Sequence, residues 1–166
     1  MRAGIALGSN LGDRFAQLRA AQAELRTLPG TEAPFLVSSI YETEPVDCEP
    51  EAARFLNAVV EIGYLGDAQS LLEQLRRIEI AFGRPPAHAR NTSRTLDLDL
   101  LYFDGLAIQS AELELPHPRM CERRFVLEPL SEIRPELVLP GQTETVAALL
   151  QRLPKTPPLL RAASEW

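Results

Sequence analysis

The sequence is poor in the residues that build disulfide frameworks and zinc sites. It has two cysteines, Cys48 and Cys121, and two histidines, His88 and His117, among 166 residues. Two cysteines do not make the framework that holds small secreted proteins together, so we expect a reduced, cytoplasmic protein. Two separated histidines without a cysteine cluster argue against a zinc site.

Long apolar runs and an excess of positive charge are also absent. No stretch approaches membrane-spanning length, and the chain enters a strand-like segment at once, so we expect no membrane segment and no signal peptide. The formal net charge of -6 argues against a broad nucleic-acid-binding surface. The content of 45% hydrophobic and 24% charged residues is ordinary for a globular protein. We expect residues 1–166 to form one domain, with an irregular tail from about residue 154.

The most informative stretch runs from Arg94 to Phe103 and has the pattern of a β-strand entered from a loop. Side chains alternate between faces along a strand, so Asp97 and Asp99 share one face. The opposite face carries leucines at 96, 98 and 100 and is expected to face the core. Paired carboxylates suit Mg²⁺ shared with substrate phosphates, because a cation relieves their mutual repulsion. The alternative is a strand whose first two outward positions are merely solvated.

The segment before this strand is cationic, although the chain as a whole is acidic. Between Gly83 and Leu96 there is no acidic residue, and the basic ones are Arg84, His88, Arg90 and Arg94. A cationic loop that leads into paired carboxylates fits a site for metal and polyphosphate, in which arginines hold phosphate oxygens. A second cationic cluster, 119–124, follows the proline-flanked His117.

The order of the expected elements predicts the fold. We expect strands at 5–7, 35–42 and 55–62 and from residue 97, and helices that begin after the capping residues Asp13 and Asp67. Further helices are expected at about 124–131 and 145–153. Strand–helix–strand–strand–helix–strand is the order of an α+β, ferredoxin-like split βαβ sandwich, an antiparallel sheet with helices packed on one face, here with C-terminal additions.

Three features of the sequence each allow two interpretations. The turn at 8–13 fits a structural turn or a phosphate cradle, although it has no Gly-Lys-Ser/Thr. Asn57 lies between apolar neighbours and needs partners from the backbone or from a ligand. Glu79, at the margin of an apolar helix face, either meets an arginine of the following loop or is exposed.

Several segments together resemble the 6-hydroxymethyl-7,8-dihydropterin pyrophosphokinase family of folate synthesis, in the family's order from Ile5 to about Pro140. The segments are Gly8-Ser9-Asn10-Leu11-Gly12-Asp13-Arg14, Tyr41-Glu42-Thr43-Glu44-Pro45, Phe55-Leu56-Asn57-Ala58-Val59, Ile78-Glu79 with Gly83-Arg84, Arg94-Thr95-Leu96-Asp97-Leu98-Asp99, and Pro116-His117-Pro118-Arg119-Met120 with Arg123-Arg124-Phe125-Val126-Leu127. The resemblance implies a ferredoxin-like fold and Mg-dependent transfer of pyrophosphate from ATP to the hydroxymethyl group of the pterin, with release of AMP.

The resemblance also implies roles for single residues. Asp97 and Asp99 would hold two Mg²⁺ ions, and Arg84 and Arg94 would act in catalysis and bind the ATP phosphates. His117 and Arg123 would also bind ATP. The pterin would be bound by Thr43, Glu44, Pro45, Phe55, Asn57 and Phe125. The partners implied are these two small molecules, with no nucleic acid and no membrane, and a monomer is expected.

The segment between Arg84 and Arg94 departs from the family's pattern at Pro86, Asn91, Thr92 and Ser93. This departure supports the alternative of a non-catalytic ferredoxin-like module that binds a nucleotide or a pterin. A phosphate-ester hydrolase built on Asp97 and Asp99 is a third possibility, but it lacks the extra carboxylates or histidines that such sites carry.

Overall fold

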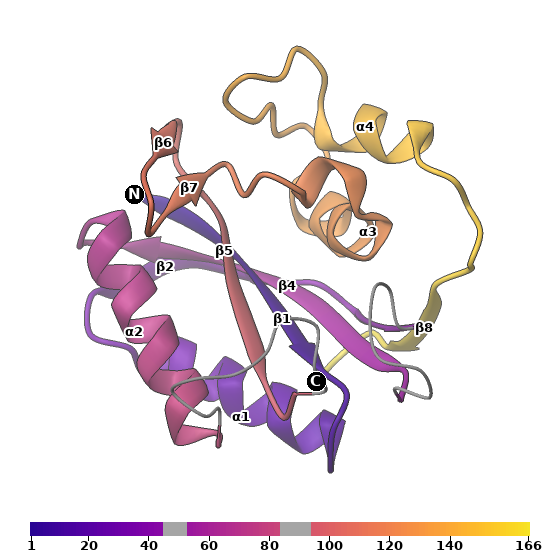
Figure 1. The fold of residues 1–166 in the computed structure, drawn as a ribbon, viewed down its shortest axis with the longest axis horizontal. Coiled ribbons are helices and arrows are strands. Elements are labelled where there is room, and N and C mark those ends of the chain that lie inside the picture. Colours follow the sequence, from indigo (N-terminus) through magenta and orange to yellow (C-terminus); the bar gives the residue numbers. More distant parts are fainter. Residues whose placement is uncertain (45–52, 84–93) are drawn as a thin grey trace.

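The computed structural model describes residues 1–44, 53–83 and 94–166, and their main feature is an antiparallel sheet (Figure 1). The strands β5 (Asp97–Phe103), β1 (Arg2–Ser9) and β4 (Phe55–Tyr64) are neighbours in this order, with β5 at one edge of the sheet and β1 and β4 inside it. Both β2 (Thr31–Val37) and β3 (Ile40–Thr43) pair with the other edge of β4. The ends of β1, β4 and β5 that carry Gly8, Asn57 and Asp97 therefore lie side by side.

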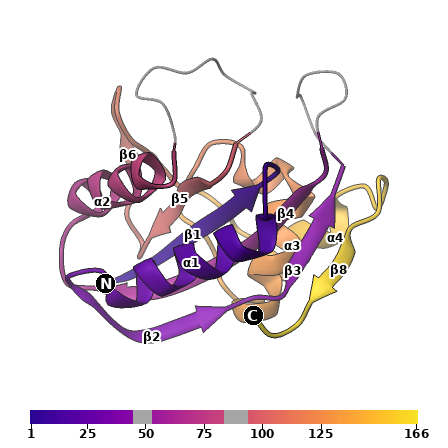
Figure 2. The ribbon, with the colours of Figure 1, turned by 90° about the horizontal axis from the view of Figure 1, so that it is seen from below.

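Two helices cover one face of this sheet, as Figure 2 shows from below. They are α1 (Arg14–Thr27) and α2 (Ala68–Ala81), and the side chains of Asp13 and Asp67 cap them as predicted. Helix α1 packs against β1 and β4 and helix α2 against β5, with Leu18, Leu25, Leu71 and Leu75 fully buried. This is the arrangement that the alternating and helical apolar patterns predict.

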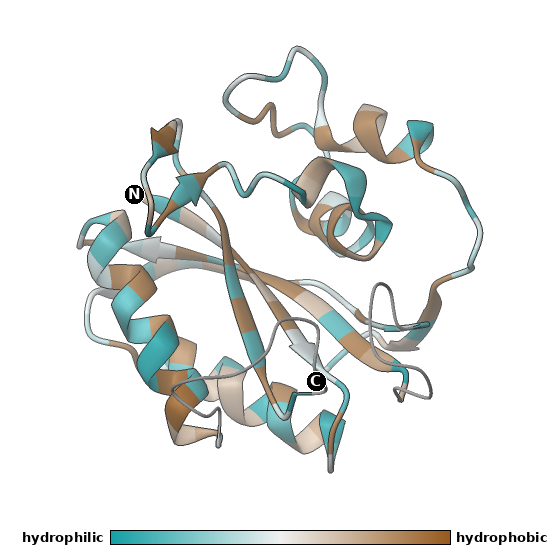
Figure 3. Ribbon diagram, in the orientation of Figure 1, coloured by the Kyte–Doolittle hydropathy of each residue, from teal (hydrophilic) through white to brown (hydrophobic). Residues whose placement is uncertain are grey.

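The opposite face of the sheet is covered by the C-terminal part of the chain. Helix α3 (Arg124–Ile133) packs on β4, and α4 (Val146–Arg152) packs on α3. Two short strands, β6 (Ile108–Gln109) and β7 (Glu114–Leu115), and a turn of 3-10 helix, η1 (Met120–Glu122), connect β5 to α3. In Figure 3 the central strands are largely brown, whereas α2 alternates between teal and brown, as expected for a sheet covered by amphipathic helices.

A buried charge fixes the C-terminal end of α3 to the sheet. Glu61 of β4 is 1% exposed, pairs with Arg134 just after α3 and accepts a hydrogen bond of 2.6 Å from the hydroxyl of Tyr102. A buried carboxylate needs partners of this kind because its desolvation is costly. The ring of Tyr102 lies where the side chain of residue 4 would be, and a Cβ on Gly4 would come within 2.1 Å of it.

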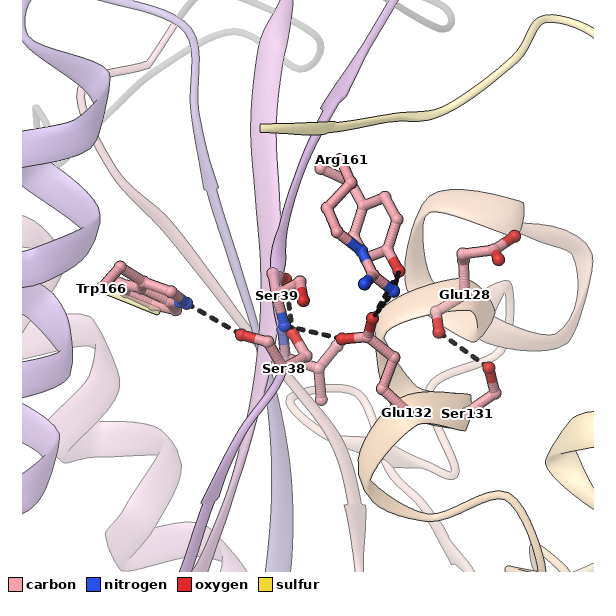
Figure 4. A network of polar contacts seen from close by, with 9 residues as sticks. Ser38, Ser39, Glu128, Ser131, Glu132, Arg161 and Trp166 are labelled. Carbon is pink, nitrogen blue, oxygen red and sulfur yellow. Dashed lines mark hydrogen bonds and ion pairs between the residues drawn. The ribbon is translucent and has the colours of Figure 1, made fainter. Parts of the chain in front are cut away.

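The expectation of an irregular tail from about residue 154 is wrong for its last part. Residues 160–163 form β8 (Leu160–Ala163), which pairs with β3 as the outer strand of the sheet. Figure 4 shows the polar contacts that hold it, in which Arg161 pairs with Glu132 of α3 and the indole nitrogen of Trp166 donates to the carbonyl of Ser38 at 2.8 Å. The signal is weak in sequence because an edge strand of four residues is stabilised by partners far along the chain.

The rest of the predicted fold agrees with the structure. The expected strand at 35–42 is divided into β2 and β3, because the hydroxyl of Ser38 accepts the backbone N–H of Val59 and so replaces a ladder bond. The split βαβ order and the antiparallel sheet are confirmed, with α1 and α2 on one face and the C-terminal additions on the other. No helix among residues 1–44, 53–83 and 94–166 has the length and apolar character to cross a membrane.

Candidate active site

A cavity of about 620 Å³ lies between the sheet and the start of α3. Its floor is formed by the neighbouring ends of β1, β4 and β5, and its wall by the segment that leads from His117 into α3. It brings together ten of the residues that the sequence singles out, namely Thr43, Glu44, Phe55, Asn57, Arg94, Asp97, Asp99, His117, Arg123 and Phe125.

The two carboxylates occupy one side of this cavity. Asp97 is the first residue of β5, and Asp99 lies two residues further on the same face, next to Ala6 of β1. Their leucine neighbours, Leu98 and Leu100, are buried on the opposite face, as the alternation predicts. Burial and then the charge of Asp97 raise the pKa of Asp99, while nearby cationic groups act in the opposite direction. Such a site favours a cation.

Arg94 lies at the entrance of β5 and forms an ion pair with Asp97. Its backbone is held by Asn10, because the Arg94 N–H donates to Oδ1 of Asn10 at 2.6 Å and the Asn10 N–H donates to the Arg94 carbonyl at 3.0 Å. The Nε of Arg94 is buried without a hydrogen-bond partner among the described residues. The guanidinium group therefore keeps a donor to offer to an anion.

The opposite wall is cationic. His117, Arg119 and Arg123 line it, and the backbone N–H of His117 donates to the carbonyl of Leu101 at 2.8 Å, which ties this wall to β5. Burial is the main cause that lowers the pKa of His117, and it outweighs the opposite effect of Asp99. A neutral imidazole beside two arginines can donate to a phosphate or a ribose oxygen.

The end of the cavity at β4 is aromatic and amide-lined. Asn57 is 8% exposed, and its Nδ2 donates to Oγ1 of Thr43 at 2.8 Å, a side-chain partner where the sequence indicates the backbone or a ligand. Phe55, two residues earlier on β4, and Phe125, in the first turn of α3, line the same end. Arg123 lies over the ring of Phe125, with the guanidinium carbon 5.4 Å from the ring centroid. This end suits a flat, polar-edged heterocycle.

Four residues contribute to the site in ways that were not predicted from the sequence. Asn10 belongs to the turn at 8–13, and it holds the backbone of Arg94, which agrees with the structural interpretation of this turn. Gly8 and Arg119 line the cavity. Glu79 is 3% exposed and accepts the backbone N–H of Leu98 at 2.9 Å, so the interpretation of Glu79 as exposed is wrong and it supports β5. The loop residues Arg84 and Arg90, which belong to the other interpretation, lie outside the described residues.

Some predicted site residues lie outside the described residues. These are Arg84 and Pro45, together with the cationic His88 and Arg90 and the departures from the family pattern at residues 86 and 91–93. The side chain of Glu44, which is described, pairs with Arg54 at 2.5 Å.

Comparison with known proteins gives one consistent result. The family model described as 7,8-dihydro-6-hydroxymethylpterin-pyrophosphokinase matches residues 4–135. The chain is 48% identical over 129 residues to the 2-amino-4-hydroxy-6-hydroxymethyldihydropteridine pyrophosphokinase of Bacillus subtilis strain 168, covering 78% of this chain and 75% of that protein. It is 40% identical over 137 residues to the protein of the same name from Haemophilus influenzae, covering 82% of this chain and 84% of that protein.

Solved structures agree at the level of the fold. A crystal structure of Plasmodium falciparum HPPK-DHPS with pteroate superposes with a TM-score of 0.66 at 15% identity and covers 91% of this chain. A structure of HPPK-DHPS in complex with substrates has a TM-score of 0.68 at 13% identity and covers 90% of this chain. The match covers 42% of each of those longer chains, so it concerns one part of them.

Proposed function

Because the chain belongs to the 7,8-dihydro-6-hydroxymethylpterin-pyrophosphokinase family, its function is the transfer of pyrophosphate from ATP to hydroxymethyldihydropterin in folate biosynthesis, and we propose that the cavity between β5 and α3 is where this transfer takes place. The observation that carries this assignment is the convergence of paired carboxylates, guanidinium groups and an aromatic amide-lined end in one cavity. These are the three kinds of groups that ions, polyphosphate and a pterin need.

Asp97 and Asp99 are proposed to hold two Mg²⁺ ions. No cluster of three or more metal-ligating side chains occurs within the described part of the chain, so these carboxylates would share the ions with phosphate oxygens and water. Magnesium fits this donor set, because it keeps several waters and is held by one or two carboxylates plus substrate phosphates. Burial, and after it the charge of Asp97, raises the pKa of Asp99, and a bound cation would oppose both effects. The bound ions would neutralise charge on the phosphate oxygens.

The protein's own groups would hold the two substrates in line. Arg94, with its unpartnered Nε, and Arg84 would stabilise charge on the phosphates during transfer, while His117 and Arg123 would bind other parts of ATP. Phe55 and Phe125 would enclose the pterin ring, with Asn57 at its edge and Thr43, Glu44 and Pro45 beside it.

The chemical step needs no covalent enzyme intermediate. The hydroxymethyl oxygen attacks the β-phosphorus of ATP, the bond from that phosphorus to the α,β-bridging oxygen breaks, and AMP leaves. The hydroxyl proton passes to solvent or to a carboxylate. Positioning and charge neutralisation account for catalysis of this kind.

Three further properties are part of the proposal. We infer that residues 1–166 act as a single domain, that the chain works as a monomer, and that it resides in the cytoplasm. The scarcity of cysteine and the absence of a long apolar run in the sequence support the last point.

The test is AMP release from Mg-ATP with and without 6-hydroxymethyl-7,8-dihydropterin. AMP that forms only with the pterin supports pyrophosphate transfer. Binding of both ligands without AMP would instead indicate a non-catalytic module, and AMP or phosphate formed without the pterin would indicate a hydrolase.

A further inference from the structure

Three glycines interrupt the central strands, and two of them are explained by protein packing. Glycine weakens a strand, so it marks places where a ligand or another backbone comes close. A Cβ on Gly4 would lie 2.1 Å from the ring of Tyr102, and one on Gly63 would lie 2.5 Å from the carbonyl oxygen of Ala33. At both positions a side chain would force neighbouring atoms to shift.

Gly8 is different, because no described protein atom requires it. A Cβ there would lie 3.4 Å from Oδ1 of Asn57 and 3.9 Å from both the Cβ of Asp97 and the ring of Phe55. These are ordinary contact distances, so alanine fits the protein itself. The backbone of Gly8 has no positive φ that would demand glycine. The strand therefore lacks a side chain at a position where the fold would accept one.

The position of Gly8 in the sheet gives the reason. It is paired with Asn57 of β4 on one side and with Asp97 of β5 on the other. Its missing side chain would project into the cavity, between the residues assigned to the pterin and those assigned to the ions and phosphates. Neighbouring strands lie about 4.8 Å apart, so Gly8 occupies the middle of a span of about 10 Å between the two halves of the site.

We propose that Gly8 is a specificity-determining residue that admits the hydroxymethyl arm of the pterin to the β-phosphate. The reacting oxygen must come within about 3.5 Å of the phosphorus, and the arm has to cross the floor between Asn57 and Asp97 to do so. A methyl group at residue 8 would fill part of the space that the hydroxymethyl arm needs. It would leave open the positions of the pterin ring on one side and of the nucleotide on the other. This inference rests on the proposed function of the cavity.

The test compares Gly8→Ala with the unchanged protein and with Gly105→Ala. Gly105 lies in the turn after β5, has no positive φ, and a Cβ there would meet nothing within 4 Å, so it controls for the substitution itself. Binding is measured by calorimetry for three probes, namely Mg-α,β-methylene-ATP alone, and 6-hydroxymethyl-7,8-dihydropterin and unsubstituted 7,8-dihydropterin in its presence. Thermal unfolding reports on the fold.

We expect Gly8→Ala to weaken binding of the hydroxymethyl pterin by about tenfold or more, the effect of one unwanted methyl group in a fitted pocket. Binding of the unsubstituted pterin and of the nucleotide analogue should change by less than about threefold on the same scale. The unfolding temperature should not fall, and Gly105→Ala should bind all three probes normally.

Equal losses for the two pterins, or an unchanged affinity of Gly8→Ala for the hydroxymethyl pterin, would overturn the inference. Loss of nucleotide binding would overturn it as well, because Gly8 would then border the phosphates rather than the crossing. Failure of the proposed function looks different, since the unchanged protein would then release no AMP in the presence of the hydroxymethyl pterin.

Discussion

Arg94 forms an ion pair with Asp97 at the entrance of β5, three residues further along the chain. Both side chains are mostly buried, at 21% and 23% exposure. Arg94, which is proposed to bind phosphate, thus contacts Asp97, which is proposed to bind an ion, and each side chain compensates the charge of the other before the substrates bind. When Mg-ATP binds, the Asp97 carboxylate would contact the ion and the Arg94 guanidinium would contact a phosphate. Each charged side chain would then exchange one partner for another, and no unpaired charge would be buried.

The carboxylates are expected to be needed for turnover and not for folding. Asp97→Asn and Asp99→Asn keep the shape of the side chain but remove the charge, and each should lower the rate of AMP formation by about a hundredfold or more, as loss of a preorganised electrostatic group does. Calorimetry should show weaker Mg²⁺-dependent ATP binding, and the circular dichroism spectrum should be unchanged.

A matched control lies at the opposite end of the same strand. Asp104 follows β5 and accepts the backbone N–H of Arg2 at 3.0 Å, away from the cavity. Asp104→Asn should keep full activity. Near-normal rates in both Asp97→Asn and Asp99→Asn would remove the assignment of these residues to the ions.

The same substitution at Asp99 is expected to stabilise the metal-free protein. Burial and the charge of Asp97 raise the pKa of Asp99 in the folded state above its unfolded value. The folded protein then binds more protons than the unfolded chain between the two pKa values, so the free energy of unfolding falls as pH rises through this window and stays low above it. Asp99→Asn removes that loss.

Thermal unfolding in EDTA measures this effect. At pH 7 the variant should unfold at a higher temperature than the unchanged protein, and its stability should depend less on pH between the ordinary aspartate range and neutrality. An unfolding temperature below that of the unchanged protein at pH 7 would show that Asp99 is stabilising as a carboxylate, contrary to this account.

The aromatic end of the cavity should affect the pterin more than the nucleotide. Phe55→Ala removes one proposed wall, and loss of a stacking contact of about 1–3 kcal/mol corresponds to a tenfold or greater loss of pterin binding. Phe125→Ala should weaken pterin binding by a similar factor. Because Arg123 lies over the ring of Phe125, that variant should also weaken ATP binding slightly, whereas Phe55→Ala should not.

Fluorescence or calorimetric titration of each ligand alone distinguishes these effects. Phe125→Trp keeps an aromatic ring at this position and should therefore retain much of the pterin binding that Phe125→Ala loses. If both phenylalanine variants lose the two ligands equally, the cavity is not divided between a pterin end and a nucleotide end.

The local parts of the site could be predicted from the sequence, because short-range rules determine them. The period of two along a strand places Asp97 and Asp99 together, and the helix caps at Asp13 and Asp67 follow from local hydrogen bonding. The clamp of Asn10 on Arg94 could not be predicted in this way, because it joins residues 84 positions apart. The position of Gly8 in the cavity could not be predicted either, because it depends on the pairing of β1 with β4 and β5, which are distant in the sequence.

The ion pair of Glu61 and Arg134 is expected to carry much of the stability of α3 on the sheet. Arg134→Ala leaves the carboxylate of Glu61 buried without its charge partner, although the hydroxyl of Tyr102 remains, and this should lower the free energy of unfolding by about 3 kcal/mol. Arg152→Ala is the matched control, because its pair with Glu144 is at the surface, with Arg152 69% exposed, and should cost less than about 1 kcal/mol. Urea unfolding measures both, and adding Glu61→Gln to Arg134→Ala should recover part of the loss, because no charge is then left unpaired. A double variant less stable than Arg134→Ala alone would mean that the carboxylate stabilises the fold even without the arginine.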